Sequence, residues 1–283
     1  MRILFVGGGN MAQAILGGLI AQKFPPENFY VIEPMAETRA AIAALGINVH
    51  ASIGESFVDC DAIVLAVKPQ TMNVAISPLA TKLTSQVVIS IAAGINTSSL
   101  GCWLGRTATP YDNIVRAMPN TPALIRAGIT GLYASSGVNE KGRQIAESLL
   151  GAVGKTVWFD DETMLDAVTA VSGSGPAYVF YFIEALEEAA LQLGFEPETA
   201  RTFAVQTFLG STQLVASTRD SPALLRARVT SRRGTTERAI ETFDERKLKN
   251  SFIDGVKAAA ARSRELGEEL RTLPTENSGA KHT

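Results

Sequence analysis

The chain has 283 residues, of which 46% are hydrophobic, and a formal net charge of −2 at pH 7. This length and apolar content predict two domains of ordinary size, and no run is long enough to cross a bilayer. The near-neutral charge without a long basic tract argues against nucleic acid or an anionic membrane surface as the main partner. We therefore expect a protein that acts on a small molecule.

The two cysteines, Cys60 and Cys102, have neither metal-ligand spacing nor the pattern of a disulfide framework. We interpret both as buried thiols in a reducing cytoplasm, and we expect no metal site. Strand-like residues begin at position 3, which leaves no room for a signal peptide in this sequence. The expected location is the cytoplasm.

The first predicted elements surround a glycine triplet. The apolar run from Ile3 to Val6 stops at three glycines and is followed by a segment of helical period that reaches Ala21. This order is typical of a strand, a tight turn and a helix. Gly7, Gly9 and Ala12 match the dinucleotide pattern G-x-G-x-x-A, in which the backbone and the helix start face a pyrophosphate. The alternative is a turn with no ligand.

The next apolar run, Phe29 to Ile32, is followed by Glu33, twenty-four residues beyond Gly9. In a dinucleotide-binding fold, an acid at this place binds the diol of the adenine ribose. The alternative is a solvated residue at a strand end.

Strand-length apolar runs continue to alternate with helical segments up to about residue 158. This alternation predicts a parallel sheet wrapped by helices, with ligands beyond the carboxyl ends of its strands. Lys68-Pro69 and Ala92-Ala93-Gly94 stand at two such ends, and Lys68 faces either a cofactor or solvent. Asn120, between two prolines, either binds ligand or holds its own loop. The later strand candidates are Ala62 to Val67, Val87 to Ile91, Ile114 to Met118 and Gly128 to Tyr133.

After Trp158, helical periods occupy nearly everything to about Leu270. We expect a dinucleotide-binding domain over residues 1–159, a helical domain over 160–272 and a disordered polar tail over 273–283. The aromatic residues between Tyr178 and Leu193 are interpreted as core or subunit interface.

A second glycine, Gly234, precedes Thr235 and Thr236 where another helical period begins. A glycine that leads into a helix start presents free amides to an anion, and here two hydroxyls accompany them. The alternative is that one threonine is only the N-cap of its own helix. Because His50 and His282 are the sole histidines, an alcohol dehydrogenase with a histidine base is poorly supported. Reduction of a carbon–nitrogen double bond needs less help, since a hydroxyl that relays one proton suffices.

With these motifs in order, the chain closely resembles the pyrroline-5-carboxylate reductases over residues 1 to 270. The resemblance implies an α/β fold, with an N-terminal Rossmann domain followed by an all-α dimerisation domain through which two subunits interlock. The matching stretches are Val6-Gly-Gly-Gly-Asn-Met-Ala12, Ala66-Val-Lys-Pro69, Ala92-Ala-Gly94, Met118-Pro-Asn-Thr-Pro122, Ser172-Gly-Ser-Gly-Pro-Ala-Tyr178, and Val229-Thr-Ser with Gly234-Thr-Thr236.

The resemblance also implies reduction of 1-pyrroline-5-carboxylate to L-proline by NADPH or NADH in a homodimer or larger homo-oligomer. The implied substrate-binding residues are Glu162, Gly234, Thr235 and Thr236, and Thr236 is the catalytic residue that hydrogen-bonds the ring nitrogen. The implied cofactor-binding residues are Gly7, Gly8, Gly9, Asn10, Met11, Glu33, Ala66, Val67, Lys68, Pro69, Ala93 and Gly94.

The chain departs from the family pattern at Arg232-Arg233, where a glycine commonly precedes the one at position 234. If that position needs a positive φ, arginine costs about 1 kcal/mol or more there. The two arginines alternatively attract a phosphate or carboxylate. Two rival functions are a β-hydroxyacid dehydrogenase, which needs a lysine that Tyr178 to Leu193 lacks, and a non-catalytic dinucleotide sensor.

Overall fold

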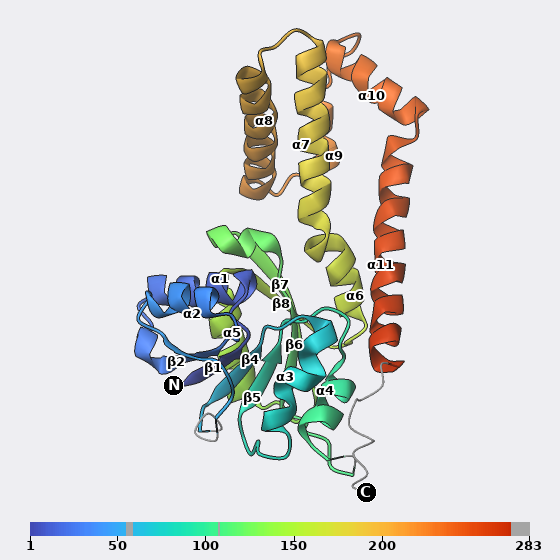
Figure 1. Ribbon diagram of the computed structural model, residues 1–283. Helices are drawn as coiled ribbons and strands as arrows, with labels where there is room; N and C mark the ends of the chain where they lie inside the picture. The colour runs from blue at the N-terminus through green and yellow to red at the C-terminus, as the bar shows by residue number, and fades with distance from the viewer. Residues whose placement is uncertain (55–58, 107, 273–283) are drawn as a thin grey trace, which may run out of the picture. The chain divides into compact units, whose positions relative to one another are not determined.

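The computed structural model describes residues 1–54, 59–106 and 108–272. The expected disordered tail, 273–283, therefore lies outside the described residues. The chain divides into two compact units: Met1–Ser174 together with the C-terminal residues from Ala259 onward, and Gly175–Ala258. Each unit is described separately below, and Figure 1 traces the chain through both.

The described strands of the first unit form one eight-stranded sheet with the order β3-β2-β1-β4-β5-β6-β7-β8. All neighbouring pairs are parallel except β6 and β7, which are antiparallel. The strands are β1 (Ile3–Val6), β2 (Phe29–Ile32), β3 (Asn48–His50), β4 (Ala62–Leu65), β5 (Val87–Ser90), β6 (Ile114–Met118), β7 (Gly128–Ala134) and β8 (Gly154–Phe159).

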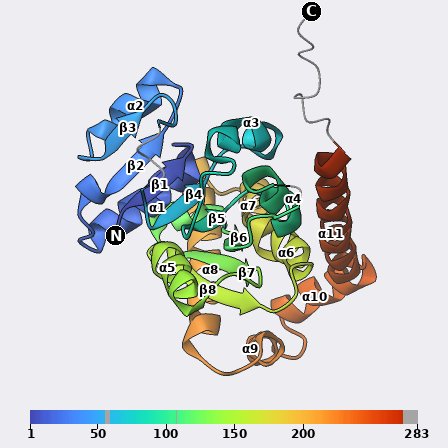
Figure 2. The ribbon, with the colours of Figure 1, turned by 90° about the horizontal axis from the view of Figure 1, so that it is seen from below.

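Helices cover both faces of this sheet, as Figure 2 shows from below. Asn96 and Asn139 cap α4 and α5 through their side-chain oxygens, which accept hydrogen bonds from first-turn amides. The helices of this unit before residue 174 are α1 (Asn10–Ala21), α2 (Ala36–Ala43), α3 (Met72–Ile76), α4 (Thr97–Leu104), α5 (Glu140–Gly151) and α6 (Met164–Val168), which runs into a π-helical turn, Thr169–Gly173.

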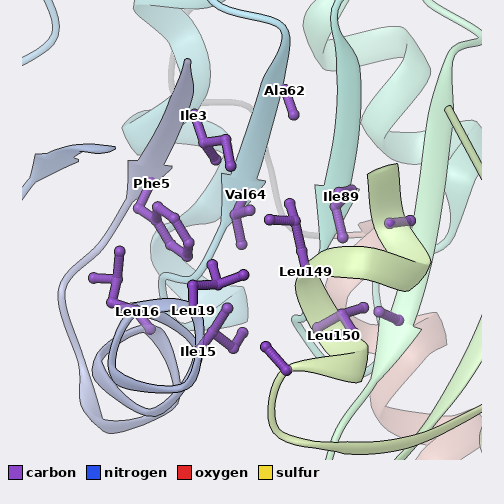
Figure 3. Close-up of a cluster of buried hydrophobic side chains, with 14 of the residues drawn as sticks. Ile3, Phe5, Ile15, Leu16, Leu19, Ala62, Val64, Ile89, Leu149 and Leu150 are labelled. Atoms are coloured by element: carbon purple, nitrogen blue, oxygen red, sulfur yellow. The ribbon is translucent and has the colours of Figure 1, made fainter. Parts of the chain in front are cut away.

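The core consists of two apolar clusters, one on each face, because alternate residues of each buried strand point to opposite sides. On β1, Phe5 enters the cluster beneath α1 and α5, and Leu4 enters the cluster beneath α3 and α4. Figure 3 shows the first cluster, where Leu16 and Leu149 point towards the strands. Continuous apolar strands buried on both faces are the mark of a parallel sheet, as the sequence predicts.

The second unit is made of helices, with α11 continuing from it into the first unit. Gly194, at a φ of +93°, follows the end of α7 (Gly175–Gln192), and prolines begin α8 (Pro197–Ser217) and α9 (Pro222–Arg228). Every helix in the described parts of the chain is too short or too polar to span a bilayer. The helices are α7 (Gly175–Gln192), α8 (Pro197–Ser217), α9 (Pro222–Arg228), α10 (Thr235–Glu245) and α11 (Leu248–Thr272).

The predicted domain boundary near Asp160 marks the end of the last strand, whereas the compact units divide the chain after Ser174. The difference arises because α6 packs on the sheet and belongs to the first unit, as does the C-terminal part of α11. Sequence periodicity indicates where strands give way to helices. It does not indicate to which compact unit a helix belongs.

The expectation that both cysteines are buried is wrong. Cys102 is exposed on α4, and Cys60 is half-buried. Burial and the neighbouring carboxylates of Asp61 and Asp59 raise the pKa of the Cys60 thiol to about 12. The Cys60 thiol is therefore kept protonated, and thus unreactive, near neutral pH.

The second unit buries very little of its own apolar surface. Among the described residues from 175 to 258, those buried in the single chain are Ala190, Ala200 and Ala204. Large side chains remain open to solvent, including Phe180 at 63% and Leu193 at 82% exposure. Exposed apolar surface on this scale is typical of an interface.

We expect the full chain to be at least a dimer in light scattering at assay concentration. The physical reason is that a second chain would bury the apolar surface that these helices leave exposed. A folded, fully active monomer would contradict this prediction and, with it, the interface interpretation of the aromatic residues in α7.

Candidate cofactor and substrate sites

The glycine turn after β1 includes one position, Gly7, that strongly favours glycine. Gly7 has a φ of +101°, in the left-handed region. A Cβ at this position would also lie 2.6 Å from the carbonyl oxygen of Ala66. The turn therefore packs against the end of β4, which places Gly7 beside Ala66 and Val67.

Gly9 leaves the start of α1 open. It is the N-cap residue of α1 and has ordinary extended backbone, with φ −68° and ψ −179°. A Cβ placed there would meet no described atom within 4 Å, and the residue is exposed. The next two amides, those of Asn10 and Met11, are first-turn amides without an acceptor inside the helix. This open backbone fits a pyrophosphate.

Glu33 is buried at the end of β2, with 8% of its surface exposed. Its Oε2 accepts the Gly8 amide hydrogen bond at 3.0 Å, and its Oε1 accepts that of Met35 at 2.9 Å. The alternative of a solvated strand end is therefore wrong. A carboxylate has about four acceptor sites, so these two bonds leave capacity for a ribose hydroxyl.

Arg39 is held at the end of β2 by the backbone of Glu33 and Pro34. Its Nη1 donates to the carbonyl oxygens of Glu33 at 2.8 Å and Pro34 at 2.6 Å. Guanidinium has five N–H donors, so the remaining ones are available to a phosphate near the ribose.

The ends of β4 and β5 border a cavity of about 450 Å³. Pro69, Ala93 and Gly94 line it, which brings three predicted cofactor residues together. Lys68 is exposed and does not line this cavity. The wall that sequence motifs did not indicate comes from α11, through residues such as Ser263 and Leu266.

Glu162 lies where α4 begins. Its Oε1 accepts from the Thr97 amide at 2.8 Å, and its Oε2 accepts from the Thr97 hydroxyl at 2.9 Å. A carboxylate at a helix N-terminus is favoured by the helix dipole. Arg116 Nη1 also donates to Oε1 at 3.2 Å, and its Nη2 lies 3.9 Å from Asp166 Oδ1.

This charge cluster borders a second, polar cavity of about 250 Å³, which Gly94, Asn96 and Arg264 also line. The Arg116 side chain is only 7% exposed, so its pairing with Glu162 and Asp166 compensates for a buried charge. Sequence reasoning missed Arg116 and Asp166 because their partners are distant in the chain and no motif marks them.

The glycine-threonine element belongs to the second unit. Gly234 is the N-cap of α10, so Thr235 and Thr236 are its first two helical residues. No side chain of the described residues caps this helix. The alternative of a threonine N-cap is therefore wrong, because the cap position falls on Gly234.

The Gly234 amide donates to the Ser231 carbonyl oxygen at 3.0 Å, which turns it away from a ligand. The first-turn amides of Thr235 and Thr236 have no acceptor within the helix. The arrangement thus offers two of the three expected backbone donors to an anion.

Arg233 has a φ of +60°, so an arginine stands in the left-handed backbone conformation considered above. The expected cost is about 1 kcal/mol. Its amide donates to Glu237 Oε2 at 2.6 Å, which stabilises this turn. Arg232 and Arg233 both expose their side chains.

Asn120 holds its own loop. Its Oδ1 accepts the Ile129 amide hydrogen bond at 2.9 Å, and the residue is 9% exposed. Of the two interpretations of Asn120, this geometry favours the structural one.

Comparison with known proteins identifies the relatives of this chain. A pyrroline-5-carboxylate reductase dimerisation model matches residues 162–266, and an NADP oxidoreductase, coenzyme F420-dependent model matches residues 2–94. The pyrroline-5-carboxylate reductase of Pseudomonas aeruginosa is 46% identical over 95% of this chain and 98% of its own length. The chain belongs to the pyrroline-5-carboxylate reductase family.

Other reductases of this family agree. The Arabidopsis thaliana pyrroline-5-carboxylate reductase is 35% identical over 94% of this chain and 96% of its own length. The structure of the Coxiella burnetii reductase superposes with a TM-score of 0.86 at 39% identity, covering 94% of this chain and 98% of its own. That of the Plasmodium falciparum reductase, with NADP bound, gives 0.82 at 28% identity, covering the same shares.

These relatives confirm the resemblance and the predicted combination of a Rossmann fold with a helical dimerisation region. The rival functions, a β-hydroxyacid dehydrogenase and a non-catalytic sensor, are not favoured. A prephenate dehydrogenase from Aquifex aeolicus, 16% identical with a TM-score of 0.52, shares the fold alone.

We expect Gly9→Val to weaken NAD(P)H binding far more than it lowers stability. The new side chain has room in the folded protein and occupies the space over the open backbone. Fluorescence titration measures binding, and thermal unfolding measures stability. Gly17→Ala, later in α1 and also facing open space, is the control. Wild-type affinity in Gly9→Val would show that the glycine turn does not bind the cofactor.

Proposed function

We propose that this protein reduces 1-pyrroline-5-carboxylate to L-proline, with NADPH or NADH as the reductant. The observation that carries the substrate assignment is 46% identity to a pyrroline-5-carboxylate reductase over 95% of the chain. The cytoplasm is the proposed location, which suits two cysteines that are free in the described structure.

The first unit binds the cofactor in this proposal. The backbone of Gly7 to Met11 takes the pyrophosphate and Glu33 takes the adenine ribose. The loops after β4 and β5 supply Ala66, Val67, Lys68, Pro69, Ala93 and Gly94 along the cofactor. When bound, the nicotinamide supplies the hydride that reaches C5 of the substrate ring.

The start of α10 binds the substrate carboxylate in this proposal. The amides of Thr235 and Thr236 are directed out of the helix start, where the helix dipole favours an anion. The exposed guanidinium groups of Arg232 and Arg233 add positive charge to the same loop. Gly234 allows the loop to pack closely, because a Cβ at this position would lie 2.5 Å from Ser231 Oγ.

The Thr236 hydroxyl acts on the ring nitrogen. An imine nitrogen is basic enough to be protonated before the hydride arrives, so the hydroxyl needs only to hold and relay one proton. It is not a strong acid, because the pKa of an alcohol is far too high to protonate an imine outright near neutrality.

Glu162 is also proposed as a substrate-binding residue, because it lines the polar cavity. Both of its oxygens already accept hydrogen bonds, so any contact with substrate uses their remaining lone pairs. In the absence of substrate, this carboxylate accepts hydrogen bonds from Thr97 and Arg116.

The proposed function is tested by adding 1-pyrroline-5-carboxylate to the enzyme with NADPH or NADH. We expect steady oxidation of the cofactor with formation of proline. No oxidation with either cofactor, in a protein shown to be folded and dimeric, would reject the function.

Thr236→Ala should lower kcat by about ten- to a hundred-fold. It removes one hydrogen bond to a group whose charge changes in the reaction, worth about 1.5–3 kcal/mol. Thr236→Ser should keep most of the activity if its hydroxyl takes the same rotamer.

Thr235→Ala is the matched neighbour, and its turnover should stay close to normal. A capping role for Thr235 would have implied a stability loss of about 1 kcal/mol, but Gly234 is the N-cap. We therefore expect little change in stability as well. Full activity in Thr236→Ala with loss in Thr235→Ala would reverse the two roles.

Glu33 should favour NADH relative to a small residue, because its carboxylate repels a 2′-phosphate. The ratio of kcat/KM for NADH and NADPH in wild type and Glu33→Ser measures this effect. An Arg39→Ala variant tests the opposing contribution, since the Arg39 guanidinium attracts a phosphate. An unchanged ratio in Glu33→Ser would show that Glu33 does not set the cofactor preference and only binds the Gly8 and Met35 amides.

A further inference from the structure

We propose that the C-terminal part of α11 positions the loop between β5 and α4, residues 91–96, for cofactor binding. This inference rests on the proposed function, because it takes Ala93 and Gly94 as cofactor-binding residues. The loop and the C-terminal part of α11 both belong to the first unit.

The most direct contact joins two glycines. Gly94 has a φ of +78°, which few other residues adopt. A Cβ at Gly267 of α11 would lie 3.0 Å from the Gly94 carbonyl oxygen. A Cβ at Gly94 would lie 3.1 Å from Leu270 Cδ1 and 3.6 Å from the Gly267 Cα. The loop and the helix therefore approach closely at these two glycines, and a side chain at either position would have to displace its neighbour.

An apolar contact supports the loop next to this point. Ala92 and Ile95 flank Ala93 and Gly94, and they are 5% and 2% exposed. Both belong to the apolar cluster beneath α3 and α4, against which Leu270 packs. Through Leu270, α11 therefore packs against the same apolar cluster that contains Ala92 and Ile95 of the loop.

A chain of polar contacts connects α11 with the far end of the loop. Ser263 Oγ donates to Asp166 Oδ1 at 2.8 Å, and the residue is 5% exposed. Asp166 lies beside Arg116, which binds Glu162. Glu162 in turn holds Thr97, the first residue of α4. Removal of one member takes a hydrogen-bond or ion-pair partner from a buried or partly buried polar group, which is costly.

These contacts bracket the loop. Gly267 and Leu270 hold its middle, and the chain from Ser263 to Glu162 holds the residue that follows it. Gly94, at the centre of the loop, is conformationally permissive and does not fix the backbone by itself. Ligand binding is sensitive to displacements of about 1 Å, so an external support of this kind affects affinity. Gly267 and Ser263 are thus positioning residues.

The test uses the full chain with Gly267→Ala, and NADPH as the probe. The added methyl group, forced against Gly94, should weaken NADPH binding by about tenfold. Amide hydrogen exchange of residues 92–97 without cofactor should become faster. Gly151→Ala at the end of α5 is the control, because it gains the same helix propensity and its Cβ meets open space among the described atoms.

Ser263→Ala is the second variant, and it keeps the test decisive if Gly267→Ala folds poorly. It should speed exchange in residues 92–97 and weaken NADPH binding, while Ser263→Thr, which retains a hydroxyl, should recover part of the affinity. Normal NADPH affinity per folded molecule in both Gly267→Ala and Ser263→Ala, even with a lower thermal midpoint, would overturn the proposal.

Gly9→Val, titrated in parallel, separates this inference from the proposed function. Loss of NADPH binding in Gly9→Val, with normal binding in both α11 variants, would overturn only the positioning role. Normal binding in Gly9→Val would overturn the assignment of the cofactor site on which the positioning role depends.

Discussion

The in-register pairing of parallel strands β1, β4 and β5 is the constraint on which the first unit depends. Val6, Leu65 and Ser90 lie side by side across the three strands, so the chain leaves all of them at one edge. Burial on both faces secures this register, because a slip by one residue would exchange the two apolar clusters. The glycine turn and the loops that follow β4 and β5 are brought together by this alignment.

Within that edge, the small residues have distinct tasks. Gly7 allows the chain to turn tightly against Ala66, and Gly9 leaves backbone uncovered. Glu33 joins the end of β2 to the same turn through the Gly8 amide. In the proposed cofactor site, missing side chains at Gly7 and Gly9 therefore matter as much as the one buried carboxylate of Glu33.

Local features of the sequence predicted the parts of the site that depend on neighbours along the chain. The spacing of Gly7, Gly9 and Ala12 indicates a turn that leads into a helix, because all its contacts start within a few residues. The position of Glu33 predicted an acid near the turn. Its bonds to Gly8 and Met35 could not be predicted, since they depend on side-chain direction at the end of β2.

The contacts that sequence reasoning could not find join residues far apart in the chain. Arg116 pairs with Glu162, and Ser263 binds Asp166, without any motif that connects them. Gly267 looks like an ordinary helical glycine until Gly94 is seen beside it. At α10, the sequence left open whether the turn binds an anion or a threonine only caps the helix, and the structure places Gly234 at the cap.

The three buried alanines of the second unit have a thermodynamic consequence. A helical unit that hides so little apolar surface by itself is stabilised further when a second chain covers that surface. Its stability then includes a mass-action contribution, so the midpoint of unfolding rises with protein concentration. Dilution weakens the fold of these helices even when no residue changes.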